Sequence, residues 1–163
     1  GLIDENSCVF LDGGTTAMYL SKEMPDIKCH VFTNGLAVGM ELAQKKNINI
    51  TIVGGQLMRD NLSTASPAAK EYFDRTNFEI AIVSATAFTP EQGFSCNSQV
   101  ESELLKSVFK KARHVYMMLD SSKIGKINPY TFARLEDIDV LITDDHFPKE
   151  YKLLFENEDI VVM

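Results

Sequence analysis

Short apolar runs alternate with amphipathic segments along most of the chain. The apolar runs end at glycine, asparagine, aspartate or small polar residues, whereas the segments between them carry apolar residues at helical spacing. The predicted strands are 8–11, 30–32, 50–53, 80–83, 115–119, 140–142 and 160–162. The predicted helices are 15–24, 36–46, 65–74, 98–111 and a short helix after Pro148. We expect irregular structure in the polar stretch 59–63, in the loop containing Pro90 and Gly93, and from 120 through Pro129.

The predicted strands favour a sheet that is covered on both sides. Runs such as 80–83 and 115–119 are apolar throughout, which is typical of strands buried on both faces. Strands that alternate with helices predict an α/β fold with a mostly parallel sheet, right-handed crossovers and helices on both faces. The sequence contains no internal repeat, low-complexity segment or linker, so we expect residues 1–163 to form a single domain.

Charge and cysteine usage narrow the possible functions. The chain of 163 residues has a net charge of −7, which is unfavourable for direct nucleic-acid binding because phosphate neutralisation needs a basic face. Its three cysteines form no CxxC pair, which argues against a disulfide framework or a zinc site and indicates a reducing compartment. His30, His114 and His146 show no metal-ligand or triad spacing. We therefore expect no metal.

The ends of the chain and its hydropathy bear on location. No apolar run is long enough to span a membrane and no signal peptide is visible, so we expect a cytoplasmic protein. The sequence starts without an initiator methionine and reaches a predicted core strand within a few residues. This start favours a piece of a longer protein, and a processed or tagged full-length chain is the alternative.

Small and polar residues follow the predicted strands. In an open parallel sheet, ligands bind beyond the carboxyl ends of the strands, so these turns are the candidate site. The turns are 12–16, 33–35, 54–55, 84–86, 120–123 and 143–145. One such turn carries little information, but their accumulation at one sheet edge predicts a ligand site there.

The first of these turns predicts an anion site. Gly13 and Gly14 allow close approach of the backbone, and Thr15 and Thr16 open a helix whose free N–H groups and dipole attract an anion such as phosphate. A tight turn in which Thr15 only caps the helix is an equally reasonable interpretation. The chain has neither GxxxxGK[ST] nor GxGxxG, so ATP and NAD binding have no support, and no cofactor is expected.

Three further features are candidates for ligand contacts, and the first two also have a structural interpretation. Gly54 and Gly55, followed by Arg59, form a second anion-contacting wall or a plain turn with a surface arginine. Lys123 supplies a cation to the ligand or is a solvated loop residue. Glu101, in the first turn of the predicted helix 98–111, places a carboxylate where it can bind sugar hydroxyls.

Taken together, these motifs resemble the C-terminal effector-sensing domain of the DeoR family of bacterial sugar-metabolism repressors. The resemblance runs from Leu2-Ile3 to Thr143-Asp144. The motifs that carry it are Val9-Phe10-Leu11-Asp12-Gly13-Gly14-Thr15-Thr16, Phe32-Thr33-Asn34, Gly54-Gly55 with Arg59, Gly93, Glu101 with Lys106, Asp120-Ser121-Ser122-Lys123-Ile124-Gly125 and Leu141-Ile142-Thr143-Asp144.

The resemblance implies a fold similar to ribose-5-phosphate isomerase and the coenzyme A transferases. It also implies a phosphorylated sugar effector, operator DNA binding only through an N-terminal helix-turn-helix that this chain lacks, and a homo-oligomer. With the strand-end turns it gives a predicted ligand site and no catalytic residue. The site residues are Asp12, Gly13, Gly14, Thr15, Thr16, Thr33, Asn34, Gly54, Gly55, Arg59, Ser84, Glu101 and Lys123.

Two departures from the family pattern leave room for other functions. Ser84-Ala85-Thr86 stands where the family usually has Gly-Ala-Asp, and Gly13 stands where a serine is more usual. An aldose–ketose phosphate isomerase with Glu101 as base is the main alternative, although Thr86 lacks a carboxylate that such an enzyme needs. A phospho-acceptor receiver domain is disfavoured because Asp12 precedes two glycines instead of belonging to an acidic pair.

Overall fold

A parallel sheet of seven strands forms the centre of the computed structural model, which describes residues 3–163. Its order is β12-β11-β9-β6-β1-β2-β3, and every neighbouring pair is parallel. The strands are β1 (Cys8–Leu11), β2 (Cys29–Thr33), β3 (Ile48–Ile52), β6 (Phe78–Ser84), β9 (Ala112–Met118), β11 (Val140–Ile142) and β12 (Val161–Val162). The predicted fold class is thus confirmed. Leu2, with which the family resemblance begins, lies outside the described residues.

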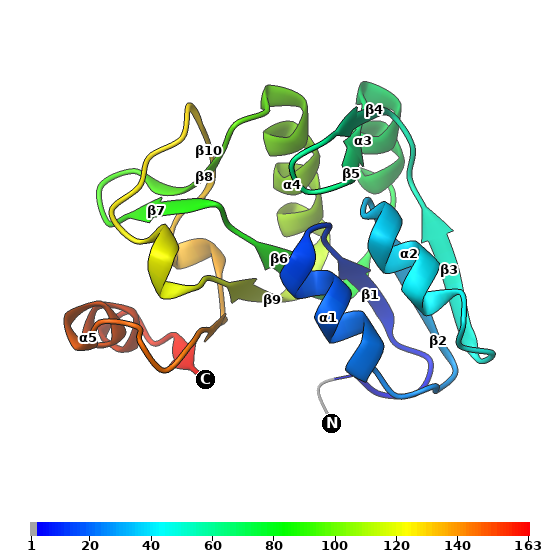
Figure 1. Ribbon diagram of the computed structural model, residues 1–163, viewed down its shortest axis with the longest axis horizontal. Coiled ribbons are helices and arrows are strands. Elements are labelled where there is room, and N and C mark those ends of the chain that lie inside the picture. The colour runs from blue at the N-terminus through cyan, green and yellow to red at the C-terminus, as the bar shows by residue number, and fades with distance from the viewer. Residues whose placement is uncertain (1–2) are drawn as a thin grey trace.

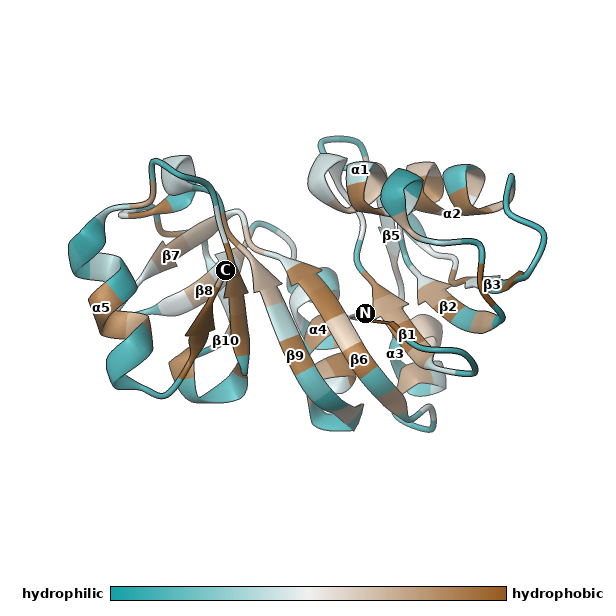
Figure 2. Ribbon diagram, turned by 90° about the horizontal axis from the view of Figure 1, so that it is seen from below, coloured by the Kyte–Doolittle hydropathy of each residue, from teal (hydrophilic) through white to brown (hydrophobic). Residues whose placement is uncertain are grey.

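Helices cover both faces of this sheet (Figures 1 and 2). On one face, α1 (Thr15–Glu23) and α2 (Leu36–Leu42) pack on side chains such as Val9 and Leu11. On the other, α3 (Pro67–Phe73) and α4 (Gln99–Lys111) pack on side chains such as Phe10. Successive residues of a strand point to opposite faces, so the fully apolar run of β1 supplies both layers. The last helix, α5 (Lys149–Asn157), contacts β12.

Two small antiparallel sheets lie in segments where no strand was predicted. One is a hairpin of β4 (Gln56–Met58) and β5 (Ser63–Ala65). The other joins β7 (Ala87–Thr89), β8 (Gly93–Cys96) and β10 (Tyr130–Ala133) in the order β10-β8-β7. The prediction of irregular structure around Pro90 and Gly93 was therefore partly wrong, because β7 and β8 flank a turn at Pro90, and the strand β10 directly after the loop through Pro129 was missed. Strands this short carry too few residues for a period-two pattern to emerge.

Two helix boundaries also differ from the prediction. The helix predicted to start at residue 65 begins at Pro67, because Ala65 pairs in β5 and the Ser66 side chain caps the helix by accepting a hydrogen bond from the Ala69 N–H at 3.0 Å. The helix predicted to reach residue 46 ends at Leu42. Element ends depend on such local contacts, which apolar periodicity does not report.

The strand order places a switch point between β1 and β6. From β1 the chain adds β2 and β3 on one side, whereas β6, β9, β11 and β12 follow in order on the other. Crossovers that leave in opposite directions open a crevice beyond the carboxyl ends of the two central strands. The fold therefore positions the turns after β1 and β6 at the natural ligand crevice of the sheet.

Candidate functional site

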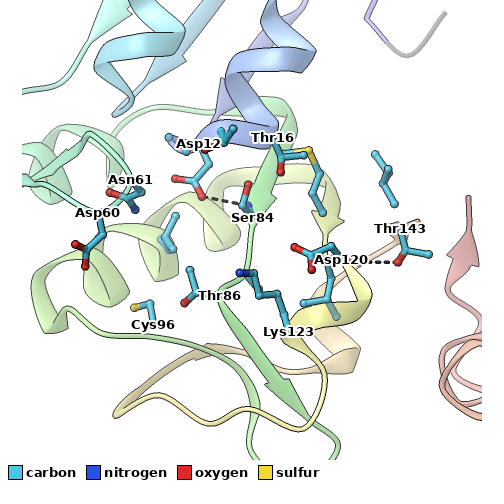
Figure 3. A pocket seen from close by; sticks show the side chains of 18 of the residues that line it. Asp12, Thr16, Asp60, Asn61, Ser84, Thr86, Cys96, Asp120, Lys123 and Thr143 are labelled. Carbon is cyan, nitrogen blue, oxygen red and sulfur yellow. Dashed lines mark hydrogen bonds between the residues drawn. The ribbon is translucent and has the colours of Figure 1, made fainter. Parts of the chain in front are cut away.

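A cavity of about 480 Å³ lies at the carboxyl ends of the central strands. Figure 3 shows side chains from the first turn, the β4–β5 hairpin and the segment after β9 facing one another around it. Its lining residues are Asp12, Gly13, Gly14, Thr15, Thr16, Asp60, Asn61, Ser84, Ala85, Thr86, Cys96, Glu101, Leu105, Met118, Leu119, Asp120, Lys123, Ile142, Thr143 and Asp144. The volume is within the range of small-molecule sites in proteins.

The turn between β1 and α1 leaves the start of the helix open to this cavity. Gly14, the residue before the helix, has a φ of 97°, and no side chain caps the helix by a hydrogen bond. Thr15 and Thr16 are exposed and line the cavity. A left-handed φ strains any residue with a Cβ, which explains glycine at position 14. The uncapped N–H groups and the positive end of the helix dipole therefore face the cavity.

Gly13 serves close packing between three segments. A Cβ at this position would lie 2.6 Å from the Cβ of Ser63 and 3.3 Å from the Cα of Gly35. A serine at position 13 would therefore have no room, because Ser63 of β5 occupies that space. The glycine holds the β4–β5 hairpin against the first turn.

Asp12 forms the buried inner wall of the cavity. Its Oδ2 atom accepts a hydrogen bond from the Ser84 N–H at 3.1 Å, which joins the ends of β1 and β6 (Figure 3). Among residues 3–163, no group is in hydrogen-bond geometry with Asp12 Oδ1, Ser84 Oγ or the amide atoms of Asn34. Burial, reinforced by the nearby Glu101 carboxylate, raises the pKa of Asp12 to about 7.

Glu101 is tied to the β4–β5 hairpin. The residue lies in the first turn of α4, which Ser98 caps, and its Oε1 atom accepts hydrogen bonds from Asn61 Nδ2 at 3.1 Å and Ser63 Oγ at 3.3 Å. Burial raises the pKa of Glu101, although these hydrogen bonds oppose the rise. Burial likewise raises the pKa of the neighbouring Cys96 thiol to about 12, so this thiol stays protonated and is a poor nucleophile.

Lys123 enters the cavity from a short turn that two carboxylates hold in place. This turn is the 3-10 helix η1 (Ser121–Lys123). The residue before it, Asp120, accepts a hydrogen bond from the Ser122 N–H at 2.9 Å. Asp144 accepts another from the Ser121 N–H at 2.6 Å. Figure 3 shows the Lys123 side chain directed into the cavity. It is the one lysine or arginine among the described residues that line it.

Thr86 uses its hydroxyl within the protein. The Oγ1 atom donates to the Ser95 carbonyl at 3.2 Å and accepts from Asn128 Nδ2 at 2.8 Å. The side chain that replaces the family's usual aspartate therefore ties the segment after η1 to β8. It lines the cavity without adding a charge.

The structure brings most of the predicted site residues together. Those that line the cavity are Asp12, Gly13, Gly14, Thr15, Thr16, Ser84, Glu101 and Lys123. Thr33 and Asn34 are fully buried and do not line it. Gly54, Gly55 and the exposed Arg59 lie outside the lining as well. Gly55, with a φ of 150°, would collide with the Ala65 carbonyl if it carried a Cβ, so it is required for the hairpin.

Several lining residues were not among the predicted site residues. Asp60 and Asn61 reach the cavity through the β4–β5 hairpin, which the sequence pattern does not reveal. Asp120, Thr143 and Asp144 stand in strand-end turns, so their position was a usable signal. Cys96 lines the cavity from β8, which was expected to be irregular.

Two further findings concern metals and membranes. Within residues 3–163, no group of three or more histidine, cysteine, aspartate or glutamate side chains is arranged to hold a metal ion. Over the same residues, no helix has the length and apolar character needed to cross a bilayer.

Comparison with known proteins gives a family match over most of the chain. The profile described as the DeoR C terminal sensor domain matches residues 1–145. An HTH-type transcriptional regulator of Bacillus subtilis, YulB, is 33% identical over 136 residues, which cover 83% of this chain and 53% of YulB. The transcriptional repressor AccR of Agrobacterium fabrum is 31% identical over 146 residues, 88% of this chain and 57% of AccR. The chain thus spans between half and two thirds of the length of these regulators.

Solved structures share the fold at low sequence identity. A ribose 5-phosphate isomerase from Plasmodium falciparum superposes with a TM-score of 0.50 at 12% identity, covering 76% of this chain and 47% of the isomerase. The β subunit of eIF2B from Chaetomium thermophilum gives a TM-score of 0.53 at 12% identity, over 85% of this chain and 44% of the subunit. These likenesses concern the fold alone.

Proposed function

The chain belongs to the DeoR family as its C-terminal sensor domain, and we propose that it binds a phosphorylated sugar in the cavity beyond β1 and β6. In the whole regulator, occupancy of this cavity changes operator binding by the DNA-binding region. The observation that carries the proposal is a single cavity lined by the uncapped start of α1, by Lys123 and by several carboxylates.

The first turn suits the phosphate. The free N–H groups at the start of α1 are available to donate hydrogen bonds to an anion, and the helix dipole adds the equivalent of about half a positive charge. The hydroxyls of Thr15 and Thr16 supply additional donors, and the Lys123 ammonium supplies the full positive charge. A phosphate with a charge of about −1.5 to −2 at pH 7 is well matched to this combination.

A second set of lining side chains suits the sugar. Asp12 and Glu101 present buried carboxylates, and carboxylate oxygens accept hydrogen bonds from hydroxyl groups. Ser84 Oγ, which has no partner among residues 3–163, is both a donor and an acceptor for the same ring. A ligand with a phosphate at one end and several hydroxyls at the other would contact the start of α1 and these polar side chains at the same time.

The ligand would couple elements that are distant in the sequence. The cavity is formed by the start of α1, the β4–β5 hairpin and η1, so one bound molecule contacts all three. Such contacts shift a conformational equilibrium only by the difference in ligand affinity between the two states. The hairpin and η1 are the elements we expect to differ between the two states.

An aldose–ketose phosphate isomerase is the second candidate. The observation that favours it is Glu101, a buried carboxylate with a raised pKa that lines the cavity. Thr86, however, offers no second carboxylate and has its hydroxyl bonded to Ser95 and Asn128. Turnover of ribose 5-phosphate that is lost in Glu101→Gln would establish the enzyme, and no turnover by the unaltered domain would speak against it.

Thermal unfolding against sugars and their phosphates tests the sensor proposal. A ligand at 100 times its dissociation constant adds about 2.7 kcal/mol, which raises the melting temperature by roughly 5–10 °C at this length. We expect a phosphosugar to stabilise the domain and its unphosphorylated parent to leave it unchanged. Lys123→Ala should remove most of the shift, whereas Lys126→Ala, an exposed lysine outside the lining, should retain it. No shift with any phosphosugar at millimolar concentration would refute the proposal.

A further inference from the structure

The cavity is strongly acidic for a site that takes an anion. Among the described residues that line it, five carry carboxylates and one carries an ammonium group. The acidic residues are Asp12, Asp60, Glu101, Asp120 and Asp144. Asp120 and Asp144 accept hydrogen bonds from backbone N–H groups of η1, which accounts for their presence in the lining. Asp60 is exposed to solvent. Asp12 and Glu101 remain, and both are buried.

These two carboxylates lack a positive partner in the described part of the chain. Neither takes part in an ion pair within residues 3–163. Asp12 is 4% exposed and its Oδ1 atom has no hydrogen-bond partner among these residues. The Glu101 charge repels the Asp12 charge, and burial penalises both. Buried carboxylates are ordinarily paired, fully hydrogen-bonded or protonated, and a cation from outside the protein would stabilise the ionised form of this pair.

The geometry also indicates which kind of cation fits. Asp12 and Glu101 belong to no group of three or more histidine, cysteine, aspartate or glutamate side chains arranged to hold a metal ion within residues 3–163. An ammonium group carries three N–H donors, which match Asp12 Oδ1, Ser84 Oγ and the Glu101 carboxylate. A neutral hydroxyl forms hydrogen bonds with the same atoms but does not offset the cost of ionising the two buried carboxylates.

We propose that the effector is a phosphorylated amino sugar, whose ammonium group binds between Asp12 and Glu101 while its phosphate binds at the start of α1. The inference rests on the proposed function and narrows its ligand class. The two sets of lining groups then have matched roles: the helix N-terminus and Lys123 neutralise the phosphate, and the carboxylate pair neutralises the amine.

Matched ligand pairs test this assignment by calorimetry at pH 7. Glucosamine 6-phosphate and glucose 6-phosphate differ only in an ammonium or a hydroxyl group, and galactosamine 6-phosphate and galactose 6-phosphate form a second pair. We expect the amino member of at least one pair to bind about tenfold or more tightly than its hydroxyl counterpart, as close charge pairs in buried sites do. N-acetylation, which removes the positive charge, should abolish this advantage.

Substitution of each carboxylate tests whether it causes the preference for the amino sugar phosphate. Asp12→Asn and Glu101→Gln should each reduce the preference to within about threefold, whereas Asp145→Asn, at an exposed position outside the lining, should keep it. A hydroxyl sugar phosphate that binds as tightly as its amino counterpart, or a preference that survives in both carboxylate variants, would overturn the amino-sugar assignment and leave the sensor proposal standing. The absence of binding by every phosphosugar would overturn both.

Discussion

Replacement of Asp12 by asparagine should make the unliganded domain more stable, and increasingly so as the pH rises. The pKa of Asp12 is raised from 3.8 to about 7, chiefly by burial and then by Glu101. A raised carboxyl pKa means that the folded state holds the proton more tightly than the unfolded state. Between these two pKa values the folded state therefore binds more protons, and its stability falls as the pH increases.

The size of this effect follows from the shift. One pKa unit corresponds to about 1.4 kcal/mol, so the difference of roughly three units removes about 4 kcal/mol of stability by pH 8. At pH 5 only about 1.5 kcal/mol of this loss has occurred. Asparagine has no charge to bury, and its Oδ1 atom can still accept the hydrogen bond from the Ser84 N–H. The stability difference between Asp12→Asn and the unaltered domain should therefore grow by about 2–3 kcal/mol between pH 5 and pH 8.

Urea unfolding of both proteins at pH 5, 6, 7 and 8 measures this difference directly. Asp145→Asn makes the same chemical change at an exposed position and controls for general charge effects. The control should show almost no change in its stability difference with pH. If the difference for Asp12→Asn is the same at pH 5 and pH 8, Asp12 is not a buried, unpaired carboxylate and the reasoning about the inner wall fails.

Four other substitutions test the packing, with stability measured by urea unfolding in each case. Phe73→Ala, at a fully buried position in the centre of an aromatic cluster, should cost about 3–5 kcal/mol, and a loss below 1 kcal/mol would contradict the described core. Ser66→Ala removes the cap of α3 and should cost about 1 kcal/mol. Gly13→Ala should lower the stability by about 1–3 kcal/mol, because the added Cβ meets the Ser63 side chain. Gly54→Ala should leave the stability nearly unchanged, because the space around it is open. Equal losses of stability in the two variants would refute the close contact at Gly13.

The sequence predicts the layers of this fold well because a parallel sheet buried on both faces leaves an unusually clear pattern. Each strand of the seven-stranded sheet corresponds to a predicted strand, and the turns between them contain the expected glycines and small polar residues. The short strands β4, β5, β7, β8 and β10 were missed, because three or four residues pair through tertiary context and not through any pattern of their own.

The site was partly predictable for the same reason. Residues at or shortly after the ends of β1, β6 and β9, such as Asp12, Ser84 and Lys123, line the cavity because parallel strands end at a common edge. Asp60 and Asn61 were out of reach, since a hairpin that was not predicted brings them over that edge. The ends of β2 and β3 were expected to contribute too, but these strands lie to one side of the switch point and their turns do not line the cavity.

Amide chemical shifts in a ¹⁵N-labelled sample test the central claim most directly, because they report where the phosphate binds. Addition of a phosphosugar that stabilises the domain should shift the backbone amides of Gly14, Thr15 and Thr16 most strongly, and the unphosphorylated parent should leave them in place. The account would be contradicted if the largest shifts occurred at Gly54, Gly55 and Arg59 and the start of α1 were unaffected. That result would place the anion site at the β4–β5 hairpin.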